Sequence, residues 1–234
     1  MGFPMTFTAG ERRRLSGDQA VSGLETSHRQ SSVRAVKPVK STRAEKAVAQ
    51  RIRILDAATQ VIGELGYGDA SVSRITQLAG IAQGTFYLYF ETRQHLFDQV
   101  LPHAGQDLML FIRERVRGSA DIFDVERRGI SAFFDYLEEN SGFYRLLNEA
   151  EFAAPAAHKV HMAQLEEHYV ASLKRAKRSD YLTNYDEEGM KAIAYAAMAA
   201  RSYLYLAYVK YGQGKRPPEA AINAYMTLLK SGLN

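Results

Sequence analysis

Apolar residues recur every three to four positions along most of this chain, which is the spacing of amphipathic helices. From residue 51 the pattern predicts a helix of about four turns, which Gly66 ends. Ser71 is a suitable N-cap for a second, shorter helix that ends before Gly80, and residues 82–90 form a third. No stretch of useful length alternates apolar and polar residues as a strand would, so the sequence predicts an all-α fold.

The same spacing continues from residue 92 and predicts a series of longer helices. Thr92 is a suitable cap for the first of them, which runs from Arg93 towards Val116. Pro102 interrupts that pattern and predicts a kink or a break near residues 101–105. Further helices are expected at about 121–139, 141–150, 156–178, 186–211 and 217–231.

The first three predicted helices have the arrangement of a helix-turn-helix. They lie within about 45 residues, and a turn that contains glycine joins the last two. A generic helical hairpin has the same pattern, so the pattern alone does not decide between them. A basic segment directly upstream favours the helix-turn-helix.

Charge is distributed unevenly along the chain. Residues 1–53 hold eleven Lys/Arg and four Asp/Glu, which leaves nineteen against twenty-two for the remainder, so the net charges are +7 and −3. This asymmetry indicates a polyanion bound from the N-terminal side, although a solubilising tail has the same composition. Residues 1–46 show no sustained apolar period, so we expect a basic, disordered arm whose cations neutralise phosphates or enter a minor groove.

Several classes of protein are excluded by what the sequence lacks. Without cysteine it has no disulfide, thiol catalysis or thiolate metal site. It has neither an apolar run long enough to cross a bilayer nor a secretory signal, so we expect a cytoplasmic protein without a membrane partner. No nucleophile–base pair, phosphate loop or cofactor motif appears, and His158 with His161 is a weak metal pattern. We therefore expect no enzyme, no cofactor and no metal.

Residues 51–101 carry a series of motifs in a fixed order. They are "ILDAA" in the first helix, "GY" in the connection, "IxxxAGIxxGTFYxYF" through the second turn, and "xTRxxLFxxVL" at the start of the fourth helix. Through these motifs the segment resembles the N-terminal DNA-binding domain of the TetR family of transcriptional regulators. The resemblance implies a helix-turn-helix domain at residues 47–92, and a larger helical ligand-binding and dimerisation domain at residues 93–234.

The resemblance places the main DNA contacts at the start of the third helix. A helix that enters the major groove needs small or polar residues in its first turn, and Gln83, Gly84 and Thr85 meet that need. Gln83 suits an adenine edge, Thr85 suits a base or a thymine methyl, and Gly84 permits close approach of the backbone. Tyr87 matches the position that contacts phosphate in the family.

Three further DNA contacts are implied outside that helix. Ser73 and Arg74 lie in the first turn of the second helix, and Arg93 lies at the start of the fourth, where the family contacts the backbone or a base edge. Two residues depart from the family pattern. Ala82 replaces the usual capping side chain of the third helix. Leu88 replaces a commonly polar or aromatic residue, and this second change bears on the DNA sequence that is read.

The aromatic residues of the third helix divide by face. Phe86 and Phe90 are four apart and therefore share one face, which we expect to pack on the first two helices. Tyr89 flanks Phe90 on the same side and is expected to lean towards the core. Tyr87 points the other way, towards the DNA.

The last two long helices are the expected dimer interface. In the family these helices form a four-helix bundle with those of a second subunit, and Ala192, Ala196, Ala199 and Ala200 permit close approach here. Burial within one subunit explains the same residues without a dimer, and the resemblance favours the dimer. A two-fold dimer implies a palindromic operator in double-stranded DNA, with half-sites one or more helical turns apart.

A candidate ligand pocket is suggested by the aromatic residues between positions 111 and 149. Packing in an ordinary core is a strong alternative for any single one of them. The candidate pocket consists of Phe111, Tyr136, Phe143 and Tyr144, with Asn148 and Glu149 as orienting polar groups.

Together these features indicate a DNA-binding transcriptional regulator. The leading hypothesis is a homodimeric repressor that a small-molecule inducer, whose identity the sequence does not reveal, releases from its operator. The alternative is an architectural or partner-regulating DNA-binding protein on the same fold without such an inducer.

Overall fold

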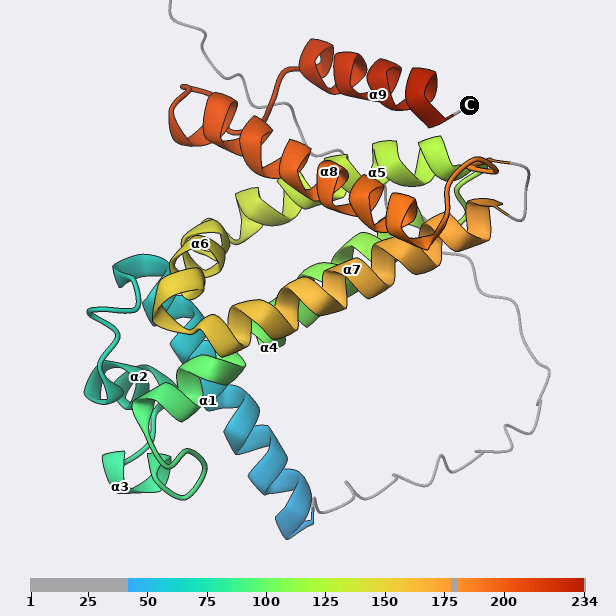
Figure 1. Cartoon of the computed structure of the whole chain (residues 1–234). Coiled ribbons are helices and arrows are strands. Elements are labelled where there is room, and N and C mark those ends of the chain that lie inside the picture. Colours follow the sequence, from blue (N-terminus) through green and yellow to red (C-terminus); the bar gives the residue numbers. More distant parts are fainter. Residues whose placement is uncertain (1–41, 178–180, 234) are drawn as a thin grey trace, which may run out of the picture. The chain divides into compact units, whose positions relative to one another are not determined.

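The computed structural model of the chain describes residues 42–177 and 181–233 (Figure 1). These residues form nine α-helices and one π-helical segment, and no strand occurs among them, so the predicted all-α fold is confirmed. The elements are α1 (Arg43–Leu65), α2 (Val72–Ala79), α3 (Gln83–Phe86), α4 (Arg93–Val116), α5 (Ile122–Glu139), α6 (Phe143–Ala153), α7 (Pro155–Lys177), α8 (Glu187–Tyr205), η1 (Leu206–Lys210) and α9 (Glu219–Leu233).

Helix α1 begins earlier than the sequence pattern predicts. Thr42 and Glu45 form a capping box, in which the backbone amide of each residue donates to the side chain of the other (2.7 and 3.2 Å). All residues from 42 to 49 are exposed, so apolar periodicity gave no sign of these turns. The expected arm of residues 1–46 is therefore too long at its end, and residues 1–41 lie outside the described part.

Helix α2 follows the prediction closely. The Ser71 hydroxyl accepts a hydrogen bond from the Arg74 amide at 3.3 Å, which confirms the predicted cap. The helix ends at Gly80, whose φ of 66° lies in the left-handed region that glycine adopts without strain.

Helix α3 is shorter than predicted, because it spans Gln83–Phe86 rather than residues 82–90. Ala82 provides no side-chain cap. The amides of Leu88 and Tyr89 donate to the carbonyl oxygens three residues earlier, at 3.2 and 2.9 Å, which is the bonding of tight turns. Tight turns, rather than a continuous helix, therefore place the aromatic residues that follow Phe86.

The long helices lie close to their predicted positions. Helix α4 continues through Pro102 without a break, so of the expected kink or break the break is wrong. A proline removes one backbone hydrogen bond, and buried neighbours on both sides, Leu101 and Ala104, hold the helix against the core. At the other end of the chain, α8 gives way to η1 instead of continuing as an α-helix to residue 211.

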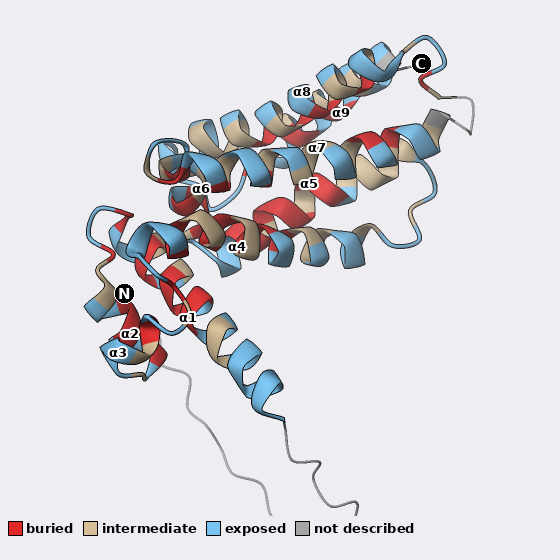
Figure 2. Cartoon of the chain, turned by 60° about the horizontal axis from the view of Figure 1, so that its bottom comes forward, coloured by how far each residue is buried: buried red, intermediate tan, exposed pale blue. Residues whose placement is uncertain are grey.

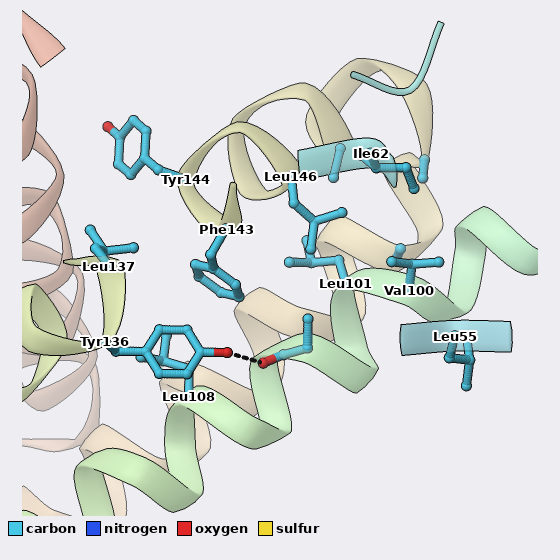
Figure 3. Close-up of a cluster of buried hydrophobic side chains, with 14 of the residues drawn as sticks. Leu55, Ile62, Val100, Leu101, Leu108, Tyr136, Leu137, Phe143, Tyr144 and Leu146 are labelled. Atoms are coloured by element: carbon cyan, nitrogen blue, oxygen red, sulfur yellow. Dashed lines mark hydrogen bonds between the residues drawn. The ribbon is translucent and has the colours of Figure 1, made fainter. Parts of the chain in front are cut away.

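One apolar interior joins α1, α4 and α6. Figure 3 shows Leu55 and Ile62 of α1 beside Val100 and Leu101 of α4, with Leu146 of α6 directed at the same cluster. All five side chains are at most 4% exposed. Because α1 packs on both α4 and α6, the helix that begins the candidate DNA-binding part rests directly on the helices that follow it. The domain boundary near residue 92 stays a prediction.

Candidate nucleic-acid interface and ligand cavity

The predicted DNA contacts lie on α2, on α3 with its following turn, and at the start of α4. Figure 2 shows this region with much exposed surface. Thr85 is half-buried. The other six residues of the predicted set are exposed: Ser73, Arg74, Gln83, Gly84, Tyr87 and Arg93.

Two phenylalanines anchor the segment that carries these residues. Phe86 and Phe90 are 0% and 1% exposed, and their ring centroids lie 5.6 Å apart, so the predicted core face is confirmed. Tyr89 is half-buried and packs against the same core. Tyr87 meets the edge of Phe86 but keeps 54% of its surface exposed, so its hydroxyl is free to contact a partner.

The basic side chains near this segment are held by local contacts. Arg74 donates from Nη1 to the Asp69 carbonyl oxygen at 3.1 Å, and the guanidinium of Arg93 lies 5.2 Å from the Phe97 ring centroid. Both remain exposed, so each presents a positive charge to solvent from a restrained position. These are suitable positions for contacts to phosphate.

Leu88, which the sequence singled out as a departure from the family pattern, is a further candidate contact outside the predicted set. Its side chain is 81% exposed in the turn after α3, next to Tyr87. A large apolar side chain gains nothing from water there, whereas the methyl group of thymine offers an apolar partner. Its departure from the family pattern was the available signal.

The aromatic residues of the predicted ligand pocket pack on one another. The ring centroids of Phe111 and Tyr136 lie 5.3 Å apart, and those of Tyr136 and Phe143 lie 5.4 Å apart. Both pairs make edge-on contacts. The Tyr136 hydroxyl donates to the Ala104 carbonyl oxygen at 3.5 Å (Figure 3). Burial raises the pKa of Tyr136 to about 12, so this hydroxyl stays protonated.

The other three residues of that set also have partners within the protein. Tyr144 stacks on Tyr205 with 3.7 Å between ring centroids. Asn148 donates to the Tyr144 carbonyl oxygen at 2.6 Å. The Glu149 carboxylate accepts from the Tyr67 amide at 2.9 Å, and so binds the chain just after α1.

A cavity of about 680 Å³ lies elsewhere, among α4, α5, α7 and α8, with Leu229 of α9 at its wall. A volume of this size is typical of a small-molecule site. None of the six predicted pocket residues lines it. The prediction relied on aromatic residues, whose edge-on contacts fill space, whereas the cavity forms where four helices leave space between them.

Polar groups gather at one wall of the cavity. Arg201 of α8 pairs with Glu126 of α5 through two contacts, Nη1 to Oε1 at 2.8 Å and Nη2 to Oε2 at 3.0 Å. The Tyr225 hydroxyl of α9 donates to the same Glu126 Oε1 at 2.7 Å, and the guanidinium lies 5.2 Å from the Tyr169 ring centroid. Burial by itself lowers the pKa of Arg201, but the Glu126 carboxylate outweighs this effect and the pKa is raised, so the guanidinium stays charged.

Sequence reasoning missed this buried pair. Arg201 stands alone in an otherwise apolar and small-residue stretch, "AYAAMAARSYLYLAY", and a single charge in such a helix was the available signal. Its partner Glu126 lies 75 residues away in sequence, so no local pattern connects the two.

Two further observations concern metal ions and membranes. Among residues 42–177 and 181–233, no group of three or more His, Asp or Glu side chains is placed to hold a metal ion. Over the same residues, every helix is too short or too polar to cross a membrane.

Comparison with known proteins finds similarity mainly in the first part of the chain. Residues 54–100 match the family described as "Bacterial regulatory proteins, tetR family". The HTH-type transcriptional activator FasR of Mycolicibacterium smegmatis is 30% identical over 103 residues, which are 44% of this chain and 47% of the relative. An uncharacterized HTH-type transcriptional regulator of Bacillus subtilis, YvdT, is 40% identical over 73 residues, 31% of this chain and 38% of the relative. The similarity thus spans less than half of either relative, and both are named as regulators of transcription.

The whole fold also has solved counterparts. The structure of the fatty acid degradation regulator FadR from Bacillus halodurans covers 77% of this chain and 94% of its own, with a TM-score of 0.62. Its sequence identity is 21%, so the similarity establishes the fold only.

Proposed function

We propose that the chain is a homodimeric, cytoplasmic repressor of the tetR family that a small molecule releases from a palindromic operator, because residues 54–100 match that family of bacterial regulatory proteins. One observation carries the DNA-binding part of the proposal. Phe86 and Phe90 are buried, while Gln83, Gly84 and Tyr87 of the same short segment are exposed. A segment fixed on one face and exposed on the other suits entry into a major groove.

Exposed stripes on α8 and α9 support the dimer. On each helix, small or apolar exposed residues recur every three or four positions, so they share one face. Small side chains let a second pair of helices approach closely, and a two-fold arrangement brings the same face of each subunit together. The stripes consist of Ala192, Ala196, Ala199 and Tyr203 on α8, and of Ala220, Ala224 and Leu228 on α9.

The cavity supports the effector part of the proposal. It is bounded by α4 and α8 among others, and α4 also packs on α1 of the DNA-binding part. A small molecule that binds better to one position of α4 shifts the population towards that position. If that position of α4 holds the two DNA-binding domains of the dimer at a distance that does not match the spacing of the half-sites, operator affinity falls.

A second candidate for the direction of control is activation of transcription. The relative FasR is named a transcriptional activator. An activator on this scaffold would bind the same kind of palindrome, and the effector would strengthen rather than release the complex.

Protection footprinting over the DNA upstream of the protein's own gene tests the proposal. We expect the full chain to protect a palindrome whose half-sites are one or more helical turns apart. Equal binding to that palindrome and to random DNA of the same length would contradict sequence-specific regulation. Transcription from the footprinted promoter, measured with and without the protein, then distinguishes a repressor from an activator.

A further inference from the structure

Resting on the proposed effector site, we infer that the cavity among α4, α5, α7 and α8 binds an uncharged, mainly apolar molecule that carries a hydroxyl or carbonyl oxygen. Two features of the cavity wall support this ligand class: its buried charges are balanced, and two of its polar atoms have no partner within the described residues.

The walls of the cavity are mainly apolar. Met109 and Ile112 of α4, Phe123 of α5, and Ile193 of α8 contribute to the lining. Such walls favour a ligand with an apolar body, because burial of that body removes apolar surface from water on both sides.

The buried charges at the wall cancel. Arg201 is 7% exposed, and both ends of its guanidinium fork are bound by the Glu126 carboxylate. A ligand carboxylate would be a second anion beside one cation, and a ligand ammonium would be a second cation beside one anion. Either would bury a charge that no protein group neutralises, which is costly in a site of low dielectric. The charge balance therefore favours a neutral ligand.

Other charged residues at the cavity do not change this balance. Arg113, Glu167 and Arg175 also line it, but all three are exposed and carry charges of both signs. Charges that water surrounds are screened and contribute little to selectivity.

Two buried polar atoms at the lining are left without a partner. Within the described part of the chain, neither Nε of Arg201 nor Oε1 of Gln164 makes a hydrogen bond, and both atoms are shielded from solvent. The Arg201 Nε–H needs an acceptor, and the Gln164 oxygen needs a donor. A hydroxyl group offers both functions, whereas a carbonyl oxygen satisfies Arg201 alone. Neither atom reaches the cavity surface in this conformation, so its side chain must turn towards the cavity to bond a ligand. An unmade buried hydrogen bond is costly, so a ligand that makes it gains affinity.

Direct binding of three matched probes tests the charge preference. Decanol, decanoate and decylamine share one chain and differ in their head group, and calorimetry on the full chain without DNA measures each affinity. We expect decanol to bind at least about tenfold more tightly than either charged probe. Tighter binding of decanoate or decylamine, or no binding by any of the three, would overturn the inference.

Substitution of the buried pair tests the stated cause. In Glu126→Gln, Arg201 loses its neutralising partner, so the ratio of decanoate to decanol affinity should rise by about tenfold or more. Should this variant fail to fold, the double variant Glu126→Leu/Arg201→Met removes both charges, which a well-packed core tolerates. That variant should bind decanol about tenfold more weakly. Glu114→Gln, at an exposed carboxylate on α4, is the control and should match the wild type.

The two levels of the proposal fail in different ways. Probe binding without any effect on DNA affinity would contradict the effector function and leave the ligand class intact. Release from the operator by decanoate but not by decanol would support an effector function and overturn the ligand class. An unchanged affinity order in folded Glu126→Gln would refute the role given to Arg201.

Discussion

At the scale of single residues, two helical glycines have opposite surroundings. A Cβ atom added at Gly105 would lie 2.2 Å from Nδ1 of His161, so the imidazole occupies the space that a side chain would need. A Cβ added at Gly84 would meet nothing within 4 Å. Packing therefore explains glycine at position 105 but not at position 84, where the proposed approach to DNA supplies the reason.

The variant Gly84→Ala separates these explanations. We expect unchanged stability, or a gain of at most about 1 kcal/mol, because alanine favours a helix. Operator affinity should fall about tenfold, since the methyl group lies where the backbone approaches DNA. Urea unfolding and DNA titration measure the two quantities. Gly105→Ala is the matched control, with a loss of about 1–3 kcal/mol of stability from overpacking. Undiminished operator binding by Gly84→Ala would remove the proposed reason for this glycine.

Tyr87 and Gln83 should affect DNA binding in different ways. Tyr87→Phe removes a hydroxyl from the proposed phosphate contact, so binding should weaken about equally for many sequences. Gln83→Ala removes a base-edge contact and should mainly change base preference, by about 1–3 kcal/mol at one position. A selection from randomised palindromes with each variant measures both effects. The reverse pattern would exchange the two roles.

His161 gives the protein a pH-dependent stability. Burial, with a smaller contribution from His158, lowers the pKa of His161 from 6.5 to about 4. Between these values the unfolded chain binds more protons, so stability is full above pH 6.5 and falls as the pH drops towards 4. The loss should be about 3 kcal/mol. Chemical unfolding at a series of pH values should show this slope in the wild type and in His168→Gln, an exposed control, but not in His161→Gln. The same slope in all three would assign it to other groups.

At the scale of elements, α1 meets the start of α6 partly through backbone atoms. A Cβ added at Gly142 would lie 2.6 Å from the Gly63 Cα, and one added at Gly63 would lie 2.9 Å from the Gly142 Cα. The Glu149 carboxylate of α6 also accepts from the Tyr67 amide at 2.9 Å. Backbone atoms cannot rotate out of the way as side chains can, so a shift of either helix is passed to the other.

Gly142→Ala should therefore disturb both stability and DNA binding. The added methyl group must separate α1 from α6, which we expect to cost about 1–3 kcal/mol of stability. Operator affinity should change as well, because α1 belongs to the DNA-binding part. Gly68→Ala is the control, since a Cβ there meets nothing within 4 Å. If Gly142→Ala matched the wild type in urea unfolding and in DNA titration, the contact between α1 and α6 would have no effect on stability or on operator affinity.

At the scale of the whole molecule, assembly should decide how DNA is read. Leu228 is 72% exposed on α9 and belongs to the stripe that we assign to the dimer interface. Leu228→Glu would place a charge in that interface, so sedimentation should show a monomer at concentrations where the wild type is a dimer. The variant should retain weak binding to a half-site and lose the preference for a palindrome. Phe152→Glu, at an 86% exposed position on α6, should remain dimeric. A dimeric Leu228→Glu would place the interface elsewhere.

Local interactions alone determined much of this protein. Helix periodicity and the caps at Ser71 and Thr92 operate over a few residues, so these helices could be predicted with good bounds. The same holds for the burial of Phe86 and Phe90, because their spacing decides which face they share. The capping box at Thr42 is equally local, but the exposed turns that follow it have no apolar periodicity.

The cavity was decided by tertiary structure. Its lining comes from α4, α5, α7, α8 and α9, and the pair of Arg201 with Glu126 joins residues 75 positions apart. Aromatic residues suggested a pocket at Tyr136 and Phe143, yet these side chains fill the core. Whether an apolar side chain meets a neighbour or empty space depends on how distant helices pack. The length of α3 also depended on more than spacing, since tight turns replace the helix after Phe86. Sequence patterns report interactions within one element, whereas a cavity is a property of the gaps between elements.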